Sequence, residues 1–142
     1  MVRKTFLLWA LVASFAMVAV AQKPVVKKVR APQTSPASGK EMYVSYCASC
    51  HGTGGKGDGP AAAALKVPPP DLTTLSRRNQ AKFPAAHVFQ AIKGDTAMVV
   101  AHGSKDMPVW GPVFSSMGKG DQAMVQLRIS NLTKYIESLQ VK

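Results

Sequence analysis

The chain has 142 residues, 46% of them hydrophobic, and carries 18 basic against 7 acidic residues, for a formal net charge of +11. This length allows one small domain with short flanking segments and excludes a protein of several domains. With only two cysteines, the chain lacks the ligands of a cysteine-rich zinc site.

Residues 1–21 have the layout of a secretory signal peptide. Arg3 and Lys4 precede an apolar run over residues 6–20, which ends in Ala19-Val20-Ala21. A basic start, an apolar centre and an A-x-A cleavage site are the three parts of such a signal. We predict cleavage after Ala21 and export to the periplasm. The alternative is an uncleaved membrane anchor, since a spanning helix needs ~17 to 25 residues; no other segment could span a bilayer.

Residues 22–38 are rich in Lys, Val, Pro, Ser and Thr and contain no acidic residue. Three prolines and the absence of aromatic side chains predict a semi-extended linker. Its positive charge could contact acidic lipid headgroups or an acidic partner, or the segment could be a solvated spacer. We expect the folded domain to span residues 39–142.

The motif Cys47-Ala-Ser-Cys50-His51 indicates covalent attachment of a c-type haem. Two thiols can each add to a vinyl group of the porphyrin, and the histidine that follows can bind the iron from one side. A dithiol redox site would need a thioredoxin-like βαβ pattern, which is not visible here. A disulfide between Cys47 and Cys50 would close too small a loop to add much stability.

Apolar residues at helical spacing predict an all-α domain that packs around the haem. The clearest helix lies near the C-terminus, with apolar residues at Val125, Ile129, Leu132, Ile136 and Leu139. Two shorter stretches precede it in the chain: one contains Met42, Tyr43 and Tyr46, and the other contains Val88, Phe89 and Ile92. No long alternating pattern of a β-strand competes with them.

A glycine-rich run over residues 52–60 must form a loop. It lacks the GxxxxGK[ST] spacing of a phosphate-binding loop, so nucleotide binding is not expected. We expect its glycines to let the backbone turn closely around the haem edge.

The sixth iron ligand determines what such a haem can do. Met107 is favoured because Pro108 follows it in an irregular run, and a following proline biases a residue to an extended conformation. Met42 and Met124 are expected to pack in helices. The complete set of candidates is Met42, Met98, Met107, Met117, Met124, His87 and His102.

At this point the sequence resembles the class I, monohaem c-type cytochromes, over essentially all of residues 39–142. The resemblance rests on an ordered set of motifs: Gly39 and Tyr43 before the haem motif, Cys47-Ala-Ser-Cys-His51-Gly, Gly57-Asp-Gly-Pro60, Pro70-Asp-Leu72, Ile92-Lys-Gly94, Met107-Pro108-Val-Trp110-Gly111, and Leu132 with Tyr135 in a terminal helix.

The resemblance implies a role for each matched position. Cys47 and Cys50 would attach the haem, His51 would be the proximal ligand, and Met107 the distal one. The Pro70 carbonyl would accept a hydrogen bond from the imidazole. Leu72 would line the haem pocket. Trp110 would lie at the haem edge, where its indole N–H could donate to a propionate. Gly39 and Tyr43 would lie where the N-terminal helix crosses the C-terminal helix at Leu132 and Tyr135.

Four polar residues keep open roles at this stage. His102 could compete for the iron and give a bis-histidine site, although the Met-Pro motif occupies the expected place. His87 is expected at the surface or on the propionate side. Arg77 and Arg78 could pair with propionates or form a solvated basic pair.

A histidine and methionine pair points to electron transfer, because both axial positions stay filled and no substrate needs to bind. We therefore expect a non-enzymatic, periplasmic one-electron carrier, monomeric or part of a redox complex. The alternatives are a subunit docked permanently to a dehydrogenase or oxidase, and a gas-binding or catalytic haem protein with a labile sixth ligand. A charge of +9 after signal removal favours an acidic redox partner. Nucleic acid is not expected, since no basic surface interleaved with aromatic residues is visible.

Overall fold

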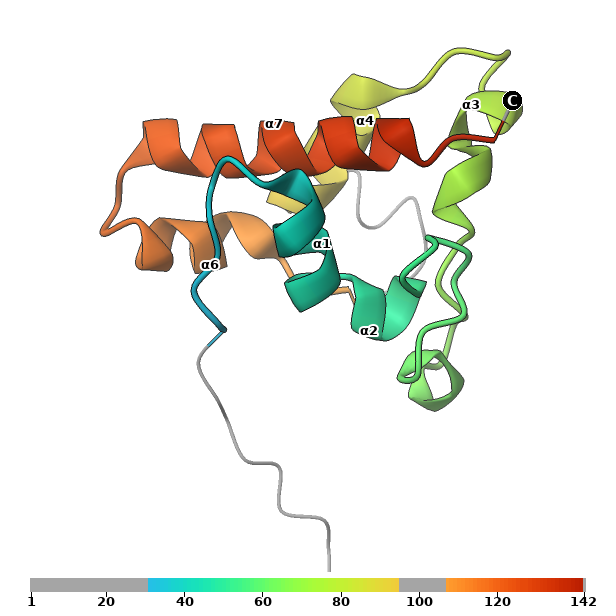
Figure 1. The fold of residues 1–142 in the computed structure, drawn as a ribbon, viewed down its shortest axis with the longest axis horizontal. Helices are drawn as coiled ribbons and strands as arrows, with labels where there is room; N and C mark the ends of the chain where they lie inside the picture. Colours follow the sequence, from blue (N-terminus) through green and yellow to red (C-terminus); the bar gives the residue numbers. More distant parts are fainter. Residues whose placement is uncertain (1–30, 95–106, 142) are drawn as a thin grey trace, which may run out of the picture. The chain divides into compact units, whose positions relative to one another are not determined.

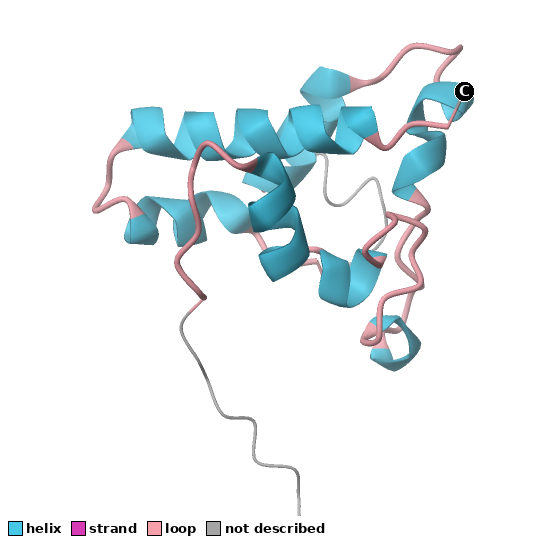
Figure 2. Cartoon of the chain, viewed as in Figure 1, coloured by secondary structure: helices cyan, strands magenta, loops and turns pink. Residues whose placement is uncertain are grey.

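A computed structural model describes residues 31–94 and 107–141 of the chain. The predicted signal peptide, residues 22–30 of the predicted linker, Met98 and His102 lie outside the described residues. Within these two ranges the secondary structure is helical, with no β-strand (Figure 2), which confirms the all-α prediction. None of the described helices is both long and apolar enough to cross a membrane.

Figure 1 shows the arrangement of the described helices. Their bounds are α1 (Gly39–Tyr46), α2 (Ala48–His51), η1 (Ala62–Ala64), η2 (Leu72–Thr74), α3 (Leu75–Arg78), α4 (Ala85–Lys93), α6 (Trp110–Met117) and α7 (Gln122–Ser138). η1 and η2 are single 3₁₀ turns.

The long helix α7 organises the domain, because α1, α4 and α6 all pack against it. Asp121 caps its start by accepting hydrogen bonds from the backbone N–H groups of Ala123 and Met124 at 2.9 and 3.2 Å. Its buried apolar side chains are Val125, Ile129, Leu132 and Ile136, as the sequence predicts. The other two predicted stretches are also confirmed, since Met42, Tyr43, Tyr46, Val88 and Ile92 are buried in the same core.

Helix α1 crosses α7 at a glycine. A Cβ atom on Gly39 would overlap the backbone carbonyl of Asn131 and lie 2.9 Å from Cβ of Tyr135. The rings of Tyr43 and Tyr135 lie beside this contact, with centroids 5.2 Å apart. The close helix crossing implied by the family resemblance is therefore present, and it depends on the missing side chain of Gly39.

Helix α6 was not predicted from the sequence. It begins inside the run that was expected to be irregular and continues to Met117. Its first turn holds Trp110, Gly111 and Pro112, residues that weaken a helical pattern. Proline is tolerated there because the first helical N–H groups have no partner inside the helix. Phe114 of this helix is fully buried.

Residues 31–38, which we call the N-terminal strap, belong to the same compact unit as the helices. Thr34 is buried, and its backbone carbonyl accepts a hydrogen bond from Arg128 at 3.0 Å. The carbonyl of Pro36 accepts one from Asn131 at 2.9 Å. Residues 31–38 of the predicted linker thus pack on the helical domain. Composition suggested a solvated segment because it does not reveal partners such as Arg128, which lie about 90 residues away in sequence.

Candidate haem site

The CxxCH motif is held on a sharp bend between two helices. Cys47 ends α1 and begins α2, so its carbonyl accepts the backbone N–H of His51 at 2.9 Å and that of Cys50 at 3.2 Å. Gly52 then ends α2 with a φ of +76°, a conformation that favours glycine. The short helix therefore places Cys47, Cys50 and His51 within one turn of backbone.

The glycine-rich loop packs behind this motif. The backbone N–H groups of Gly57 and Gly59 donate to the carbonyls of His51 and Cys50 at 2.8 and 3.1 Å. A Cβ atom on Gly59 would lie 2.6 Å from the carbonyl oxygen of Ala48, so only glycine fits this contact. None of residues 52–60 lines the cavity described next, and the expectation that the loop turns around the haem edge stays a prediction.

The CxxCH motif opens onto a cavity of about 610 Å³. All seven residues that the sequence analysis assigns to the haem site line it: Cys47, Cys50, His51, Pro70, Leu72, Met107 and Trp110. They come from the α1–α2 bend, the segment before α3 and the segment that enters α6. The volume falls within the range of roughly 300 to 1,000 Å³ that is usual for ligand and cofactor sites.

Burial controls the chemistry of His51. Burial lowers the pKa of the ring, and a hydrogen bond with the backbone of Pro70 opposes this by a smaller amount. That contact with Pro70 is loose, because the buried Nδ1 atom has no partner of good hydrogen-bond geometry within the described residues. The ring is therefore neutral at neutral pH, and a neutral imidazole is the form that binds a metal.

The thiol of Cys47 is also shaped by its surroundings. Burial, and next the neighbouring Cys50, raise its pKa to about 12. Both cysteines are free thiols in the structure rather than a disulfide. Two reduced thiols beside one cavity are what haem attachment requires.

An aromatic cluster forms the wall next to Met107. The rings of Trp110 and Tyr46 both line the cavity, with centroids 5.1 Å apart. Behind them lies Phe114, whose ring centroid is 5.6 Å from that of Trp110 and 5.7 Å from that of Tyr46. Because these rings are packed on one another, the start of α6 is a rigid support for the adjacent Met107-Pro108 segment.

The structure separates the other candidate ligands. Among the described methionines, only Met107 lines the cavity. Met42 is fully buried in the core, and the sulfur of Met117 lies 4.0 Å from the Tyr46 hydroxyl. His87 and Arg78 also line the cavity, whereas Arg77 is exposed and does not.

Sequence reasoning missed much of the apolar wall. Helix α4 contributes Val88, Ala91 and Ile92, and α7 contributes Ile136. The remaining lining residues missed are Leu65, Val67, Pro68, Pro69, Leu75, Asn79, Pro84 and Val109, together with Tyr46, which was predicted only as core. The helical spacing of Val88 and Ile92 was a usable signal, but it does not distinguish a cavity wall from ordinary core.

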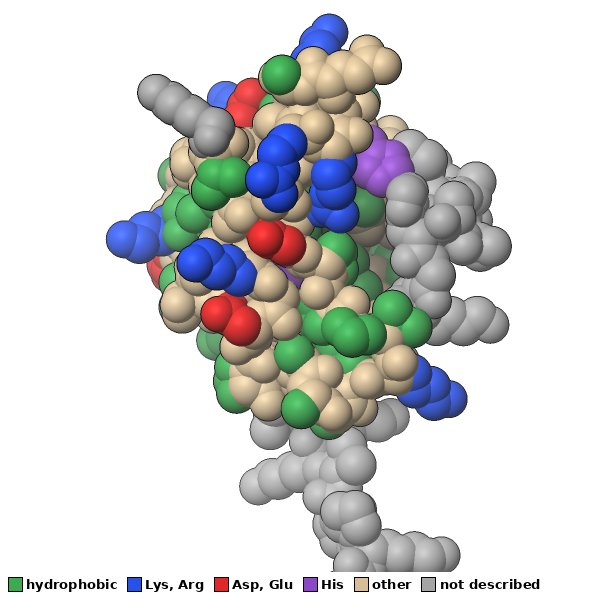
Figure 3. Space-filling view, turned by 90° about the vertical axis from the view of Figure 1, so that its right-hand side faces the viewer, with side chains coloured by type: hydrophobic (Ala, Val, Ile, Leu, Met, Phe, Trp, Pro, Cys, Tyr) green, Lys and Arg blue, Asp and Glu red, His purple; other side chains and the backbone are tan. Residues whose placement is uncertain are grey.

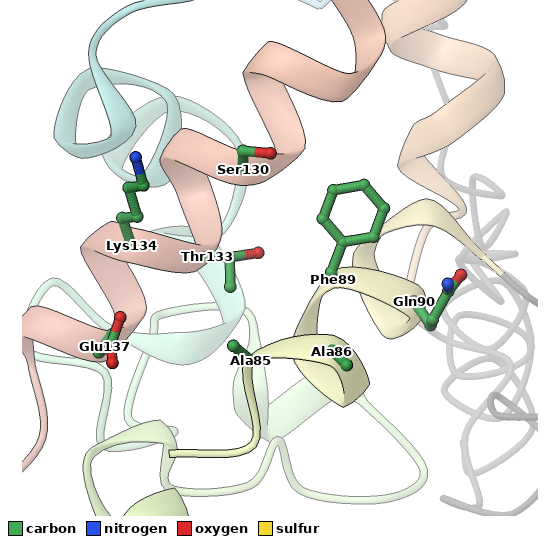
Figure 4. Close-up of a pocket in the computed structure, with 8 residues that line it drawn as sticks. All are labelled: Ala85, Ala86, Phe89, Gln90, Ser130, Thr133, Lys134 and Glu137. Carbon is green, nitrogen blue, oxygen red and sulfur yellow. The ribbon is translucent and has the colours of Figure 1, made fainter.

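A second hollow, of about 480 Å³, lies between α4 and α7 (Figure 4). Figure 4 shows Phe89 of α4 directed toward the part of α7 that carries Ser130 and Thr133, with Lys134 and Glu137 further along α7. It contains none of the residues predicted for the haem site.

The residues of the large cavity fit a c-type haem. They offer two thiols for attachment, an imidazole whose buried Nδ1 lacks a good partner, a thioether, and walls that are mostly apolar. In the described part of the chain, no group of three or more His, Cys, Asp or Glu side chains could hold a bare metal ion instead.

Comparison with known proteins supports this reading. The family model described as "Cytochrome C oxidase, cbb3-type, subunit III" matches residues 34–125, about two thirds of the chain. The match begins inside the N-terminal strap. Searches of curated proteins and of solved structures gave no match. Together with the CxxCH cavity, the family match shows that the chain belongs to this family of class I monohaem c-type cytochrome domains, binds haem c through Cys47 and Cys50, and serves haem-based electron transfer.

Proposed function

We propose that this protein is an exported one-electron carrier whose haem iron is held by His51 and Met107. The observation that supports the proposal is that an imidazole and a thioether line the same cavity as the two attachment thiols. Among the described methionines this is true of Met107 alone. Bound haem c supplies a couple between Fe(III) and Fe(II) that takes up and releases single electrons.

The chain's own residues keep this site rigid and dry. His51 is fixed by the α2 turn and the glycine loop behind it, and its lowered pKa keeps a neutral nitrogen available. The segment around Met107 is held by close contacts: a Cβ atom on Gly94 would overlap the side chain of Val109. The walls from α4 and α7 exclude water, which favours the reduced, less charged form of a buried centre.

The test is the carbon monoxide binding of the reduced, haem-loaded protein. We expect the absorption spectrum at neutral pH to be nearly unchanged by carbon monoxide, because Met107 occupies the sixth position. Met107→Ala should keep the haem attached and give a pronounced carbon monoxide spectrum. Met117→Ala is the matched control, since it removes the same side chain outside the cavity and should behave as the parent protein.

Two results would contradict the assignment. A parent protein that readily binds carbon monoxide would move gas binding or catalysis ahead of electron transfer. A Met107→Ala variant with an unchanged spectrum would mean that another residue, such as His87 or His102, is the sixth ligand.

A second candidate is a subunit docked to a larger redox complex. Val67 and Val109 both line the cavity, yet they are 44% and 43% exposed. Exposed apolar side chains at a haem site suit a protein partner, and the family description itself names an oxidase subunit. Native electrophoresis of both soluble and detergent-solubilised fractions separates the candidates: a free carrier migrates as a single small chain, whose uncleaved, haem-free form is 15.1 kDa, and a subunit migrates with its complex.

The proposed location and partners follow from the sequence. Residues 1–21 would direct export, residues 22–30 would link that segment to the packed domain, and an uncleaved signal would leave the protein near the membrane. The chain between α2 and the end of α4 carries six basic side chains against two acidic ones: Lys56, Lys66, Arg77, Arg78, Lys82 and Lys93, against Asp58 and Asp71. This excess supports an acidic redox partner.

A further inference from the structure

Arg128, in the middle of α7, carries a buried charge and does not line the haem cavity. Its side chain is 5% exposed. Within the described ranges no carboxylate forms an ion pair with it, and its Nε atom has no hydrogen-bond partner. A buried guanidinium without a counter-ion is costly, since arginine stays charged at any ordinary pH.

In the part of the chain that the structure describes, the groups that contact this cation are all neutral. One terminal nitrogen donates to the hydroxyl of Thr34 at 3.1 Å and contacts the sulfur of Met42 at 3.6 Å, and the other donates to the backbone carbonyl of Thr34 at 3.0 Å. The Tyr46 hydroxyl donates its proton to the carbonyl of Pro32 at 2.6 Å. The Thr34 hydroxyl, 2.7 Å from the same Tyr46 oxygen, must therefore be the donor in that pair.

Two layers of aromatic rings separate the charge from the haem cavity. The guanidinium carbon is 5.8 Å from the centroid of Phe114. Phe114 packs on Tyr46 and Trp110, and these two rings line the cavity. On α7 itself, the cavity-lining residue Ile136 lies eight residues beyond Arg128, or roughly 12 Å at ~1.5 Å per residue.

A charge in this position acts on the redox equilibrium. A haem bound in the cavity would supply a one-electron couple, and its reduction by a redox partner would remove one positive charge from the site without moving a proton or a bond. A fixed cation nearby therefore repels the oxidised form more than the reduced form. Solvent and salt screen this repulsion weakly, because Arg128 and the rings between it and the cavity are largely buried.

We propose that Arg128 is a potential-setting residue: its buried charge, which meets no carboxylate among the described residues, raises the reduction potential of the haem. A purely structural role, fastening the N-terminal strap, would need hydrogen-bond donors but no charge. The two roles differ in what they predict for variants that keep the charge and variants that remove it.

The experiment is a potentiometric titration of the haem-loaded protein with soluble mediators. Arg128→Met removes the charge and keeps an unbranched side chain. At a fixed potential we expect the ratio of oxidised to reduced haem to rise about threefold, which at 59 mV per tenfold for one electron is a fall of about 30 mV in the midpoint. Arg128→Lys keeps the charge, and its midpoint potential should lie close to that of the parent protein.

Two controls separate charge from structure. Lys134→Met makes the same loss of charge at an exposed position on the same helix and should leave the midpoint unchanged. Thr34→Val removes the strap's hydroxyl contact but keeps the charge, and it should also titrate like the parent. If Arg128→Met fails to fold around its haem, Arg128→Gln gives the same loss of charge with hydrogen-bond donors retained.

The proposal is overturned by either of two results. One is an unchanged midpoint in both charge-removing variants. The other is an equal fall in Arg128→Lys or Thr34→Val, which would show that the strap's packing, not the charge, sets the potential.

Discussion

Burial in a small domain gives ordinary side chains specialised properties. The ring of His51 is kept neutral because burial lowers its pKa, and Arg128 keeps its charge in a place where few groups could. Both residues meet distant segments of the chain: the Thr34 carbonyl accepts a hydrogen bond from Arg128, and the backbone of Pro70 lies near the ring of His51. Their function is thus set by neighbours that the tertiary fold supplies.

The properties of Asp71 also depend on its neighbours in the fold. It lies in the chain between Pro70 and Leu72, which both line the cavity. Its carboxylate accepts hydrogen bonds from the backbone N–H and the hydroxyl of Thr73 at 2.8 and 2.6 Å. The Thr73 hydroxyl is the main cause that lowers the pKa of Asp71, with help from Arg78 and Lys56. The ionised carboxylate therefore favours the folded state.

We expect Asp71→Ala to lower the free energy of unfolding near pH 7 by about 1 kcal/mol, the usual effect of losing a helix cap. Because the folded pKa is below the ordinary value of 3.8, the stabilisation is present above that pH and is lost as the pH falls through the lowered pKa. Denaturant unfolding of the haem-loaded protein from pH 7 to about pH 3 measures this. Asp71→Asn, which keeps a capping oxygen, should retain most of the stability at pH 7; a constant difference between parent and Asp71→Ala at all pH values would contradict the prediction.

At the scale of elements, the position of α1 on α7 decides where the haem motif lies. The motif begins at Cys47, the C-cap residue that directly follows α1, so any shift of that helix moves Cys47 with it. The crossing is tight at Gly39 and is completed by the Tyr43 hydroxyl, which donates to the Gly52 carbonyl at 2.8 Å. The packing of α1 on α7 therefore also sets the position of the haem motif.

Gly39→Ala should lower the free energy of unfolding by about 1 to 3 kcal/mol, because the added methyl group overlaps the carbonyl of Asn131. Gly54→Ala is the matched control: nothing lies within 4 Å of its added Cβ atom, and its φ is not positive. Thermal unfolding followed at the haem absorption compares the two. Equal stability of the two variants would mean that α1 can move without cost.

At the scale of the whole molecule, the charge is distributed unevenly along the chain. The face that carries α3 and the C-terminal end mixes basic with acidic side chains and has an area of hydrophobic side chains beside them (Figure 3). Lys66 is exposed and lies between Leu65 and Val67, both of which line the haem cavity. Basic residues so close to the haem site are placed to attract negatively charged partners.

We expect the rate of electron transfer to the anionic oxidant hexacyanoferrate to fall as ionic strength rises. Lys66→Glu should slow the reaction and weaken its salt dependence. Lys119→Glu makes the same change on the turn between α6 and α7, away from the cavity lining, and should have a much smaller effect. Stopped-flow measurements at several salt concentrations test this. A rate that rises with salt, or equal effects of the two variants, would rule out steering by the charges near the cavity.

The sequence by itself determined the cofactor, the helical class and three of the packed helices. CxxCH carries its chemistry in five adjacent residues, and Val125, Ile129, Leu132 and Ile136 show their shared face by spacing alone. The seven residues assigned to the haem site also line one cavity, although their individual roles stay predictions.

Only the tertiary structure decided the rest. It placed the strap residue Thr34 on Arg128, made α6 a helix despite its glycine and proline, put the glycine loop behind the haem motif, and assembled the cavity wall from α4 and α7. The physical reason is common to all four. The local spacing of apolar residues indicates which side chains are buried. It does not indicate which distant carbonyl, ring or helix they contact, because those contacts form only when the helices pack around α7.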